Sequence, residues 1–280
     1  MNNYSNSKYP LFSVLMSIYY KEKADFFRVA LESICQQSVK PNDVVVVVDG
    51  PIPEDLEFII SQFEQKLPIN VVRLPVNKGL GYALSKGLLY TKYDIVARAD
   101  SDDINDENRF EIQLNKLLKN PQLSIIGGQV AEFNTNPTII ESQRIVPITE
   151  REIYKFAKRR SPFNHPTVLF RKSAILQAGG YIDFPPFEDY HLWVRLLITG
   201  HLSANVPEVL VKMRLGNKLY QRRGGVKYLL KYIELRSYFY RSHFISVIEY
   251  IRSVLLMTIN IMLPVKLRKV AYSVFLRRQK

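Results

Sequence analysis

Five consecutive valines, at positions 44 to 48 of this 280-residue chain, restrict its fold more than any other feature. Valine is branched at Cβ and favours extended strands, and a strand that is apolar at every position has no side that can face water. Continuous runs of this kind are typical of central strands in parallel sheets, which helices cover on both faces. The segment DVVVVVDG therefore predicts a central strand, with Asp49 and Gly50 at its exit.

Strand-like and helix-like segments alternate around this run. Three more segments are typical of strands: FSVLMSIYY, INVVRLP and YDIVARAD. Between the strands, apolar residues recur at helical spacing, as in Phe27, Ala30, Leu31 and Ile34. This alternation, over roughly residues 10–105, predicts an α/β fold with a parallel, doubly wound sheet whose ligands bind at the carboxyl ends of its strands. A helix over residues 107–120 and a strand at LSIIGGQVAEF follow, and residues 149–190 are mixed, with several turn signals.

The 39 basic and 26 acidic residues are unevenly distributed. Residues 212–280 hold 16 Lys and Arg but two acids, a charge of +14, whereas residues 1–211 sum to −1. A near-neutral body with a basic tail indicates an anionic partner, either a membrane surface or a nucleic acid. The single cysteine, Cys35, excludes an internal disulfide framework, and the polar N-terminus has no features of a signal peptide. We therefore expect a cytoplasmic protein.

Acidic residues gather where two of the predicted strands end. Asp49 follows the valine strand, Asp100 ends the segment YDIVARAD, and Asp102 and Asp103 come directly after it. These strand ends should converge on one crevice, where like charges repel each other. A hard divalent cation such as Mg²⁺ or Mn²⁺ would offset the repulsion, and such ions are often shared with substrate phosphates. A solvated turn that caps the next helix is the alternative, and the cluster alone does not decide between the two.

Asp49, the segment NKGLGYALSKG and the motif ADSDD occur in an order and spacing that resemble family 2 glycosyltransferases with the GT-A fold. The middle segment has the form N-x-G-x-x-x-A-x-x-x-G, here Asn77, Gly79, Ala83 and Gly87. Downstream, NHPTVLFRKSAILQAGGY and FEDYHLWVRLL resemble bacterial enzymes that build O-antigen and capsule polysaccharides. The resemblance covers roughly residues 11–225, so we expect a catalytic domain over 1–225 and a basic helical tail over 226–280.

The resemblance implies an inverting, metal-dependent enzyme that takes a sugar from a nucleotide-sugar, with UDP as the expected nucleotide. The implied cofactor is Mn²⁺ or Mg²⁺, bound by Asp102 with help from Asp100. The pair of acids usual after the second strand is here Asp49 followed by Gly50, and we expect Arg98 to supply positive charge near the cluster. The residues implied to contact the nucleotide are Ser17, Tyr19, Asp49, Asn77, Lys78, Gly79, Arg98, Asp100, Arg222 and Arg223.

Glycosyl transfer also needs a base that deprotonates the acceptor hydroxyl. By resemblance Asp189 of the segment FEDY is this base, with Glu188 beside it, although the pair could instead cap the helix that follows. Asp103, His165 and Trp193 are candidate substrate contacts. Each has a structural alternative: Asp103 could order the aspartate loop, His165 could be a loop element, and Trp193 could lie in the core.

The tail from residue 226 onward is rich in aromatic and basic residues. Its longest uncharged run has 13 residues, fewer than the roughly 20 that a bilayer-spanning helix needs. Ser246, Glu249, Ser253 and Asn260 form a narrow polar stripe on an otherwise apolar helix, which predicts peripheral binding to an anionic membrane surface. Helices packed on the body are the alternative. The resembling enzymes act on saccharides carried by a polyprenyl diphosphate, so we expect a lipid-linked acceptor at the inner face of the cell membrane.

Two other functions share some of these features. A nucleotidyltransferase also combines a parallel sheet with acidic metal sites, but it should carry a Gly-rich basic loop near the first strand, and SVLMSIYYKEKADF has no glycine. A nucleic-acid-binding protein would use the basic tail, but no familiar nucleic-acid module is apparent and the body has no net positive charge. We therefore expect no nucleic-acid partner.

Overall fold

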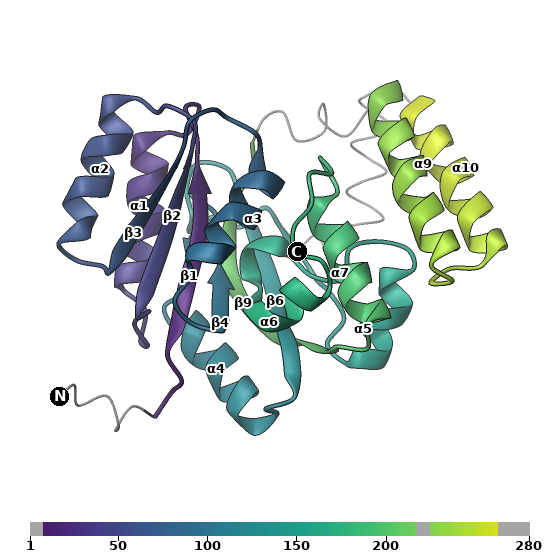
Figure 1. Cartoon of the computed structure of the whole chain (residues 1–280), viewed down its shortest axis with the longest axis horizontal. Helices are drawn as coiled ribbons and strands as arrows, with labels where there is room; N and C mark the ends of the chain where they lie inside the picture. The colour runs from purple at the N-terminus through teal and green to yellow at the C-terminus, as the bar shows by residue number, and fades with distance from the viewer. Residues whose placement is uncertain (1–7, 217–224, 263–280) are drawn as a thin grey trace.

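The computed structural model describes residues 8–216 and 225–262. Its first part confirms the predicted alternation of strands and helices (Figure 1). The elements are β1 (Phe12–Ile18), α1 (Ala24–Cys35), β2 (Asp43–Asp49), α2 (Glu54–Glu64), β3 (Ile69–Leu74), α3 (Leu80–Tyr90) and β4 (Ile95–Arg98). As predicted, β2 is central: it pairs in parallel with β1 and β3, and β1 pairs in parallel with β4.

The second part is less regular. Its elements are β5 (Ile104–Asn105), α4 (Arg109–Lys119), β6 (Leu123–Phe133), β7 (Ser142–Arg144), α5 (Glu150–Ala157), η1 (His165–Thr167), β8 (Leu169–Arg171), α6 (Lys172–Gln177), α7 (Glu188–Ile198), β9 (Leu202–Arg214), α9 (Val226–Arg241) and α10 (Val247–Met262). Strand β8 lies between β4 and β6 and is antiparallel to both, whereas β6 and β9 are parallel. The described strands form one mostly parallel sheet in the order β3-β2-β1-β4-β8-β6-β9-β5, with β7 on β6.

The valines of β2 divide between two hydrophobic cores, one on each face of the sheet. Val45 and Val47 pack with Leu15 of β1 in one core, and the other three valines belong to the second. Helices α3, α6 and α7 cover the first core, and α1, α2 and α4 cover the second. The valine run is therefore buried on both sides, as its composition requires.

Helix α3 lies very close to the sheet because it carries a glycine where the two meet. A Cβ atom on Gly87 would lie 2.4 Å from Val47 Cγ2 and 2.6 Å from Leu15 Cδ1, so a larger residue would push the helix away. The small residues of the segment NKGLGYALSKG thus bring the start of α3, and the loop before it, to the carboxyl edge of β2.

A buried arginine joins the aspartate strand to the second part of the sheet. Arg109 of α4 is fully buried, and its guanidinium donates hydrogen bonds to the carbonyl oxygens of Arg98 at 2.6 Å and Val168 at 3.3 Å. Burial, together with the nearby charge of Arg98, lowers the pKa of Arg109 to about 9. These contacts hold the end of β4 against the segment that leads into β8.

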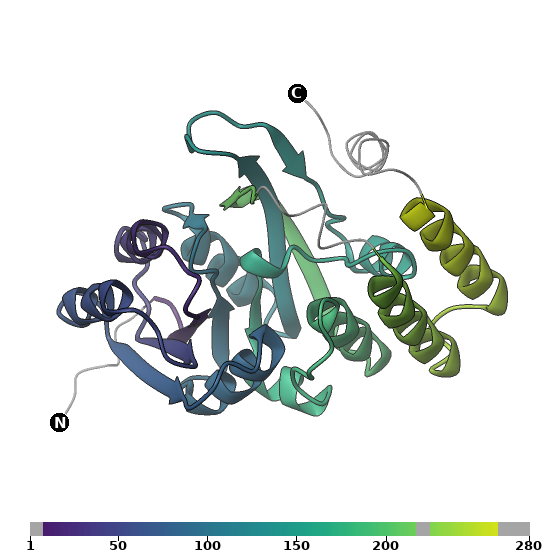
Figure 2. The same cartoon turned by 90° about the horizontal axis from the view of Figure 1, so that it is seen from above.

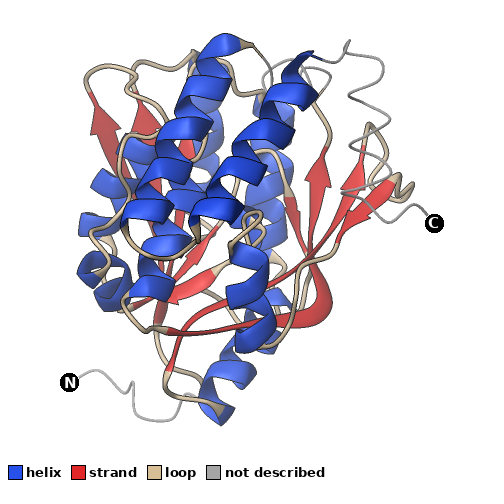
Figure 3. Ribbon diagram, turned by 90° about the vertical axis from the view of Figure 1, so that its right-hand side faces the viewer, coloured by secondary structure: helices blue, strands red, loops and turns tan. Residues whose placement is uncertain are grey.

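The C-terminal helices α9 and α10 lie side by side at one end of the molecule (Figures 2 and 3). Tyr232, Leu235 and Phe239 of α9 are buried, and the Phe239 ring lies 5.0 Å from that of Tyr190 in α7. Helix α9 therefore shares the core of the body, as the packed-helix alternative predicted. Helix α10 packs on α9 and buries none of its residues fully. No helix within the described residues is long and apolar enough to cross a membrane.

Candidate active site

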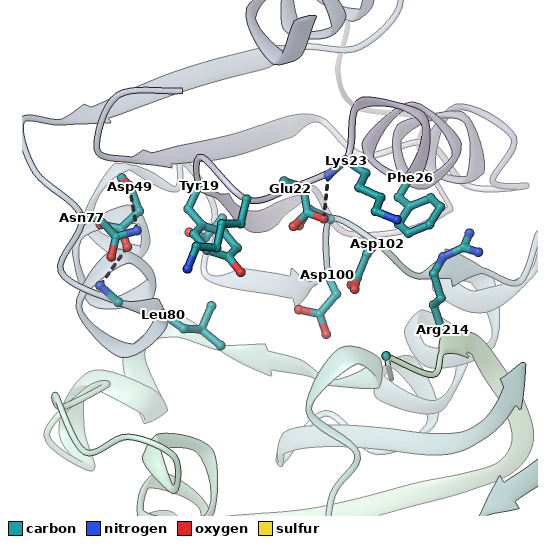
Figure 4. Close-up of a pocket in the computed structure, with 15 residues that line it drawn as sticks. Tyr19, Glu22, Lys23, Phe26, Asp49, Asn77, Leu80, Asp100, Asp102 and Arg214 are labelled. Atoms are coloured by element: carbon teal, nitrogen blue, oxygen red, sulfur yellow. Dashed lines mark hydrogen bonds between the residues drawn. The ribbon is translucent and has the colours of Figure 1, made fainter. Parts of the chain in front are cut away.

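A pocket of about 660 Å³ opens where β1, β2 and β4 end (Figure 4). Asp49, Asp100 and Asp102 all line it, so the predicted convergence of the two strand exits is confirmed. The other lining residues are Ser17, Tyr19, Lys21, Glu22, Lys23, Phe26, Asn77, Gly79, Leu80, Ser101, Arg214 and Gly216. Among the described residues that were expected to contact the nucleotide, Lys78 and Arg98 are the two that do not line this pocket.

Asp49 organises the loop at one end of the pocket. Its carboxylate accepts hydrogen bonds from the backbone N–H groups of Lys78 and Gly79, both at 2.8 Å, and Asn77 Nδ2 donates to its carbonyl oxygen at 3.1 Å. An acidic residue cannot take the place of Gly50 directly after Asp49. Gly50 has φ +84°, and a Cβ there would lie 2.6 Å from the Asn77 backbone nitrogen. Lys78 contributes its backbone N–H, while its ammonium group lies over an aromatic ring of α3.

One buried arginine holds the aspartate cluster. Arg98 is 2% exposed and forms an ion pair with both carboxylate oxygens of Asp100. Arg98 therefore supplies positive charge to the cluster, as expected. Its guanidinium is buried outside the pocket lining, and a contact with the nucleotide stays a prediction. Burial, together with the negative charges of Asp100 and Glu22, raises the pKa of Asp102 to about 7. Among the pocket carboxylates, Asp102 is thus the one whose ionised form a nearby cation would stabilise most.

The residues present fit a divalent cation that shares its ligands with a substrate rather than one enclosed by protein. Within residues 8–216 and 225–262, no group of three or more His, Cys, Asp or Glu has the arrangement of a metal site. Magnesium is nevertheless commonly held by one or two carboxylates together with substrate phosphates and water. Asp102, with Asp100 beside it, matches that pattern, and a cation there would offset the repulsion that raises the pKa of Asp102.

Asp103 is buried and does not line the pocket. It is 3% exposed, and its Oδ1 accepts a hydrogen bond of 2.9 Å from the backbone N–H of Arg214, at the end of β9. Burial, reinforced by Asp100 and Asp102, raises the pKa of Asp103 well above its ordinary value. This hydrogen bond joins the aspartate loop to β9, which agrees with the alternative that Asp103 orders the loop. A sugar contact by Asp103 stays a prediction.

Glu188 and Asp189 begin α7, next to the start of α3. A Cβ on Gly81 would lie 3.3 Å from the Cβ of Glu188, which places the acidic pair beside the pocket wall formed by Gly79 and Leu80. Burial, followed by the charge of Asp189, raises the pKa of Glu188 to about 7. The Oε2 atom of Glu188 is buried and has no hydrogen-bond partner among the described residues. This pair therefore adjoins the pocket, as an acceptor base would have to.

His165 and Trp193 belong to an aromatic cluster. Trp193 is fully buried, and its ring centroid lies 5.6 Å from that of Phe163 and 5.8 Å from that of His165. The expected stacking of Trp193 on a sugar is therefore wrong, because its position on α7 turns the ring into the core. His165 Nε2 is hydrogen-bonded to the Tyr181 hydroxyl at 3.0 Å, and burial lowers the pKa of His165 well below its ordinary value. A substrate contact by His165 stays a prediction.

Glu22, Phe26 and Arg214 are among the pocket residues that the sequence did not predict. They come from the loop after β1, from α1 and from the end of β9, and no sequence motif connects these segments. A serine hydroxyl of the aspartate loop donates to Glu22 at 2.6 Å, which brings another carboxylate to the cluster. Arg222 and Arg223, which were expected near the diphosphate, lie outside the described residues.

Comparison with known proteins decides the class of this chain. The family model described as glycosyl transferase family 2 matches residues 13–180, more than half of the sequence and all the elements from β1 to α6. The chain belongs to glycosyltransferase family 2. The resemblance found in the sequence is confirmed, and the protein is classed as a glycosyltransferase rather than as a nucleotidyltransferase or a nucleic-acid-binding protein.

This glycosyltransferase is similar to bacterial relatives over nearly its whole length. It is 42% identical over 267 residues to an uncharacterized glycosyltransferase of Haemophilus influenzae, covering 95% of this chain and 99% of the relative. It is 39% identical over 269 residues to the UDP-Gal:alpha-D-GlcNAc-diphosphoundecaprenol beta-1,3-galactosyltransferase of Escherichia coli, covering 96% of this chain and 98% of the relative. The similarity therefore includes the C-terminal helices.

Solved structures share the fold. TarS 1–349 of S. aureus in complex with UDP-GlcNAc has a TM-score of 0.64 at 15% identity, covering 95% of this chain and 76% of that one. The mannosyltransferase PcManGT of Pyrobaculum calidifontis, in complex with GDP-Man and Mn²⁺, has a TM-score of 0.63 at 15% identity, covering 95% and 75%. The predicted GT-A fold is thus confirmed for this glycosyltransferase.

Proposed function

We propose that this glycosyltransferase transfers a sugar from a UDP-sugar to a saccharide carried on a polyprenyl diphosphate, in the synthesis of a surface polysaccharide. The pocket is the main support: it has an ordered loop at one end and, next to it, carboxylates whose mutual repulsion a cation would offset. A relative of 39% identity is named for a UDP-sugar donor and a diphosphoundecaprenol-linked acceptor.

The donor is assigned to two parts of the pocket. The nucleotide base lies against Asp49 and Asn77, with Tyr19 beside it, and the diphosphate lies at Asp100 and Asp102. A divalent cation held by Asp102, when bound, would supply Lewis-acid stabilisation of the departing diphosphate. A neighbour in fold whose complex contains Mn²⁺ supports this assignment.

Asp189 is assigned as the base. Its carboxylate takes the proton of the acceptor hydroxyl while the acceptor oxygen bonds to the anomeric carbon. The bond from that carbon to the diphosphate oxygen breaks on the opposite side, so the configuration is inverted. Glu188 is the alternative base, because a pKa near 7 suits proton transfer at neutral pH.

The proposed activity is tested with the full-length protein, Mn²⁺ and a synthetic diphosphoundecaprenol-linked GlcNAc acceptor. UDP-Gal, UDP-Glc, UDP-GlcNAc and, for comparison, GDP-Man are offered separately, and the lipid product is analysed by mass spectrometry and by its anomeric NMR signals. We expect transfer from at least one UDP-sugar, with release of UDP and a β-linked product. Transfer from GDP-sugars alone, or retention of configuration, would contradict the proposal.

A lipid-linked acceptor requires the enzyme to work at a membrane surface, and α10 is suited to that contact. Its outward side also carries exposed Arg252 but is otherwise apolar, with residues that are 48–80% exposed: Val247, Ile248, Ile251, Leu255, Leu256, Ile259 and Met262. Its polar Ser253 faces the protein instead and accepts a hydrogen bond of 2.8 Å from buried Arg236 of α9. Residues 226–280 carry 11 basic and two acidic residues, a charge that complements anionic lipid.

The double variant Leu255→Ser and Ile259→Ser is expected to bind anionic vesicles about 10- to 100-fold more weakly than the wild type. Burying a Leu or Ile side chain contributes roughly 1.5–3 kcal/mol, and each of these is already partly covered. Cosedimentation with phosphatidylglycerol–phosphatidylcholine vesicles measures the change. Phe58→Ser, on the 58% exposed phenylalanine of α2, is the matched control. Unaltered vesicle binding by the double variant, or a wild-type dimer that the variant disrupts without any lipid binding, would contradict the lipid contact.

A further inference from the structure

Arg214 lines the pocket, and the contacts of its side chain are unusual for a partly buried arginine. Its guanidinium lies over two aromatic rings, with Cζ 3.7 Å from the centroid of Phe26 and 4.7 Å from that of Phe133. Its Nε is buried and has no hydrogen-bond partner among the described residues. Its backbone N–H donates to Asp103, so the main chain is fixed as well. Among the described residues, the guanidinium of Arg109 donates to several protein oxygens, whereas that of Arg214 has no hydrogen-bond acceptor.

A second cation shares the ring of Phe26. The ammonium group of Lys23 lies 4.9 Å from the ring centroid, and Lys23 also lines the pocket (Figure 4). The two positive groups lie at the end of the pocket that holds Asp102, away from Asp49 (Figure 4). Within the described part of the chain, neither Lys23 nor Arg214 forms an ion pair with an acidic side chain. Two like charges at one ring are most stable when an anion binds between them.

We propose that Arg214 and Lys23 form a diphosphate-binding subsite, in which Arg214 makes a two-point contact with phosphate oxygens. The two rings hold the guanidinium from its sides and Nε is buried, so the terminal Nη groups of this pocket-lining arginine are the ones left for a ligand. The separation of these groups matches two oxygens of one phosphate, and the aromatic rings fix the plane before the ligand arrives. The source of the diphosphate rests on the proposed function: it belongs either to the nucleotide donor or to the lipid carrier of the acceptor.

The test compares Arg214→Gln with Arg73→Gln, which removes an exposed arginine of β3 that pairs with Glu57 at 2.6 Å. Calorimetric titrations measure the affinity for UDP, uridine and inorganic diphosphate, and steady-state assays measure KM for the lipid-linked acceptor. If the donor supplies the diphosphate, Arg214→Gln should weaken UDP and diphosphate binding about 10- to 100-fold and leave uridine binding unchanged. If the lipid carrier supplies it, UDP binding should stay unchanged while KM for the acceptor rises by a similar factor.

Two further variants keep the test independent of folding defects. Arg214→Lys retains the charge but not the planar fork, so it should recover part of the lost affinity, and Lys23→Gln should cause a smaller loss of the same kind. Melting curves establish which variants are folded. If Arg214→Gln is not folded, Arg214→Lys and Lys23→Gln take its place in the comparison. Unchanged diphosphate affinity and unchanged acceptor KM in the folded variants would overturn the subsite. Wild-type protein that binds diphosphate through Arg214 but neither binds UDP nor transfers sugar would overturn the proposed function and leave the subsite standing.

Discussion

Asp102→Asn should lower the rate of sugar transfer by roughly 10²–10³-fold, with saturating UDP-sugar and Mn²⁺. Asparagine has nearly the same size, but it lacks the charge that would hold a cation beside the diphosphate. The measurement is the initial rate of transfer to the lipid-linked acceptor. Asp106→Asn is the matched control, since Asp106 is an exposed aspartate of the next turn and its carboxylate accepts a hydrogen bond that the asparagine oxygen can keep.

The same substitution should raise the melting temperature of the metal-free protein. The pKa of Asp102 is raised from 3.8 to about 7 in the folded protein, so the folded state holds this proton more tightly than the unfolded state does. Ionisation of Asp102 therefore costs stability as the pH rises above about 3.8, and the cost is complete above about 7. Without metal, the melting temperature of Asp102→Asn should exceed that of the wild type at pH 8, and the two should be equal near pH 3. Mn²⁺ should raise the melting temperature of the wild type but not that of Asp102→Asn.

Unimpaired transfer by Asp102→Asn, together with melting equal to the wild type at pH 8, would contradict the role given to this carboxylate. A gain in stability with no loss of transfer would mean that Asp102 is strained by its neighbours but does not hold the cation.

Asp189→Asn should lower kcat by about 10²–10⁴-fold and leave the affinity for UDP unchanged. The base acts on the acceptor hydroxyl, so its loss slows the chemical step without removing a contact to the nucleotide. Rapid-quench assays of transfer and calorimetric titrations with UDP separate these two quantities.

Glu188→Gln is the paired variant, because it changes the adjacent acid in the same turn of α7. We expect it to retain most of the activity. If Glu188 were the base instead, the wild-type rate would rise as the pH passes its pKa of about 7, and Glu188→Gln would cause the larger loss. That result would exchange the two roles.

Local patterns in the sequence determined the first part of the sheet and the position of the site. The valine run has apolar side chains on both faces, and only a strand covered on both sides can accommodate it. Asp49 and Asp102 follow two parallel strands, and parallel strands end at the same edge, so these two carboxylates had to meet. The glycines of the segment after β3 similarly limited how α3 could lie on the sheet.

Tertiary contacts decided which polar residues face the pocket. Arg98 and Asp103 are only a few residues from Asp102, yet both are buried, Arg98 with Asp100 and Asp103 against β9. Arg214 lies 111 residues from its partner Asp103, a separation that no local motif spans.

The same reason applies to the C-terminal helices. Helical periodicity shows that α10 has one apolar side, and the contact of Ser253 with Arg236 decides that this side faces outward. The sequence by itself determined which chemical groups stand at the strand ends and which helices are amphipathic. The tertiary structure decided which of those groups remain accessible, because burial and pairing depend on contacts between segments that are far apart in the chain.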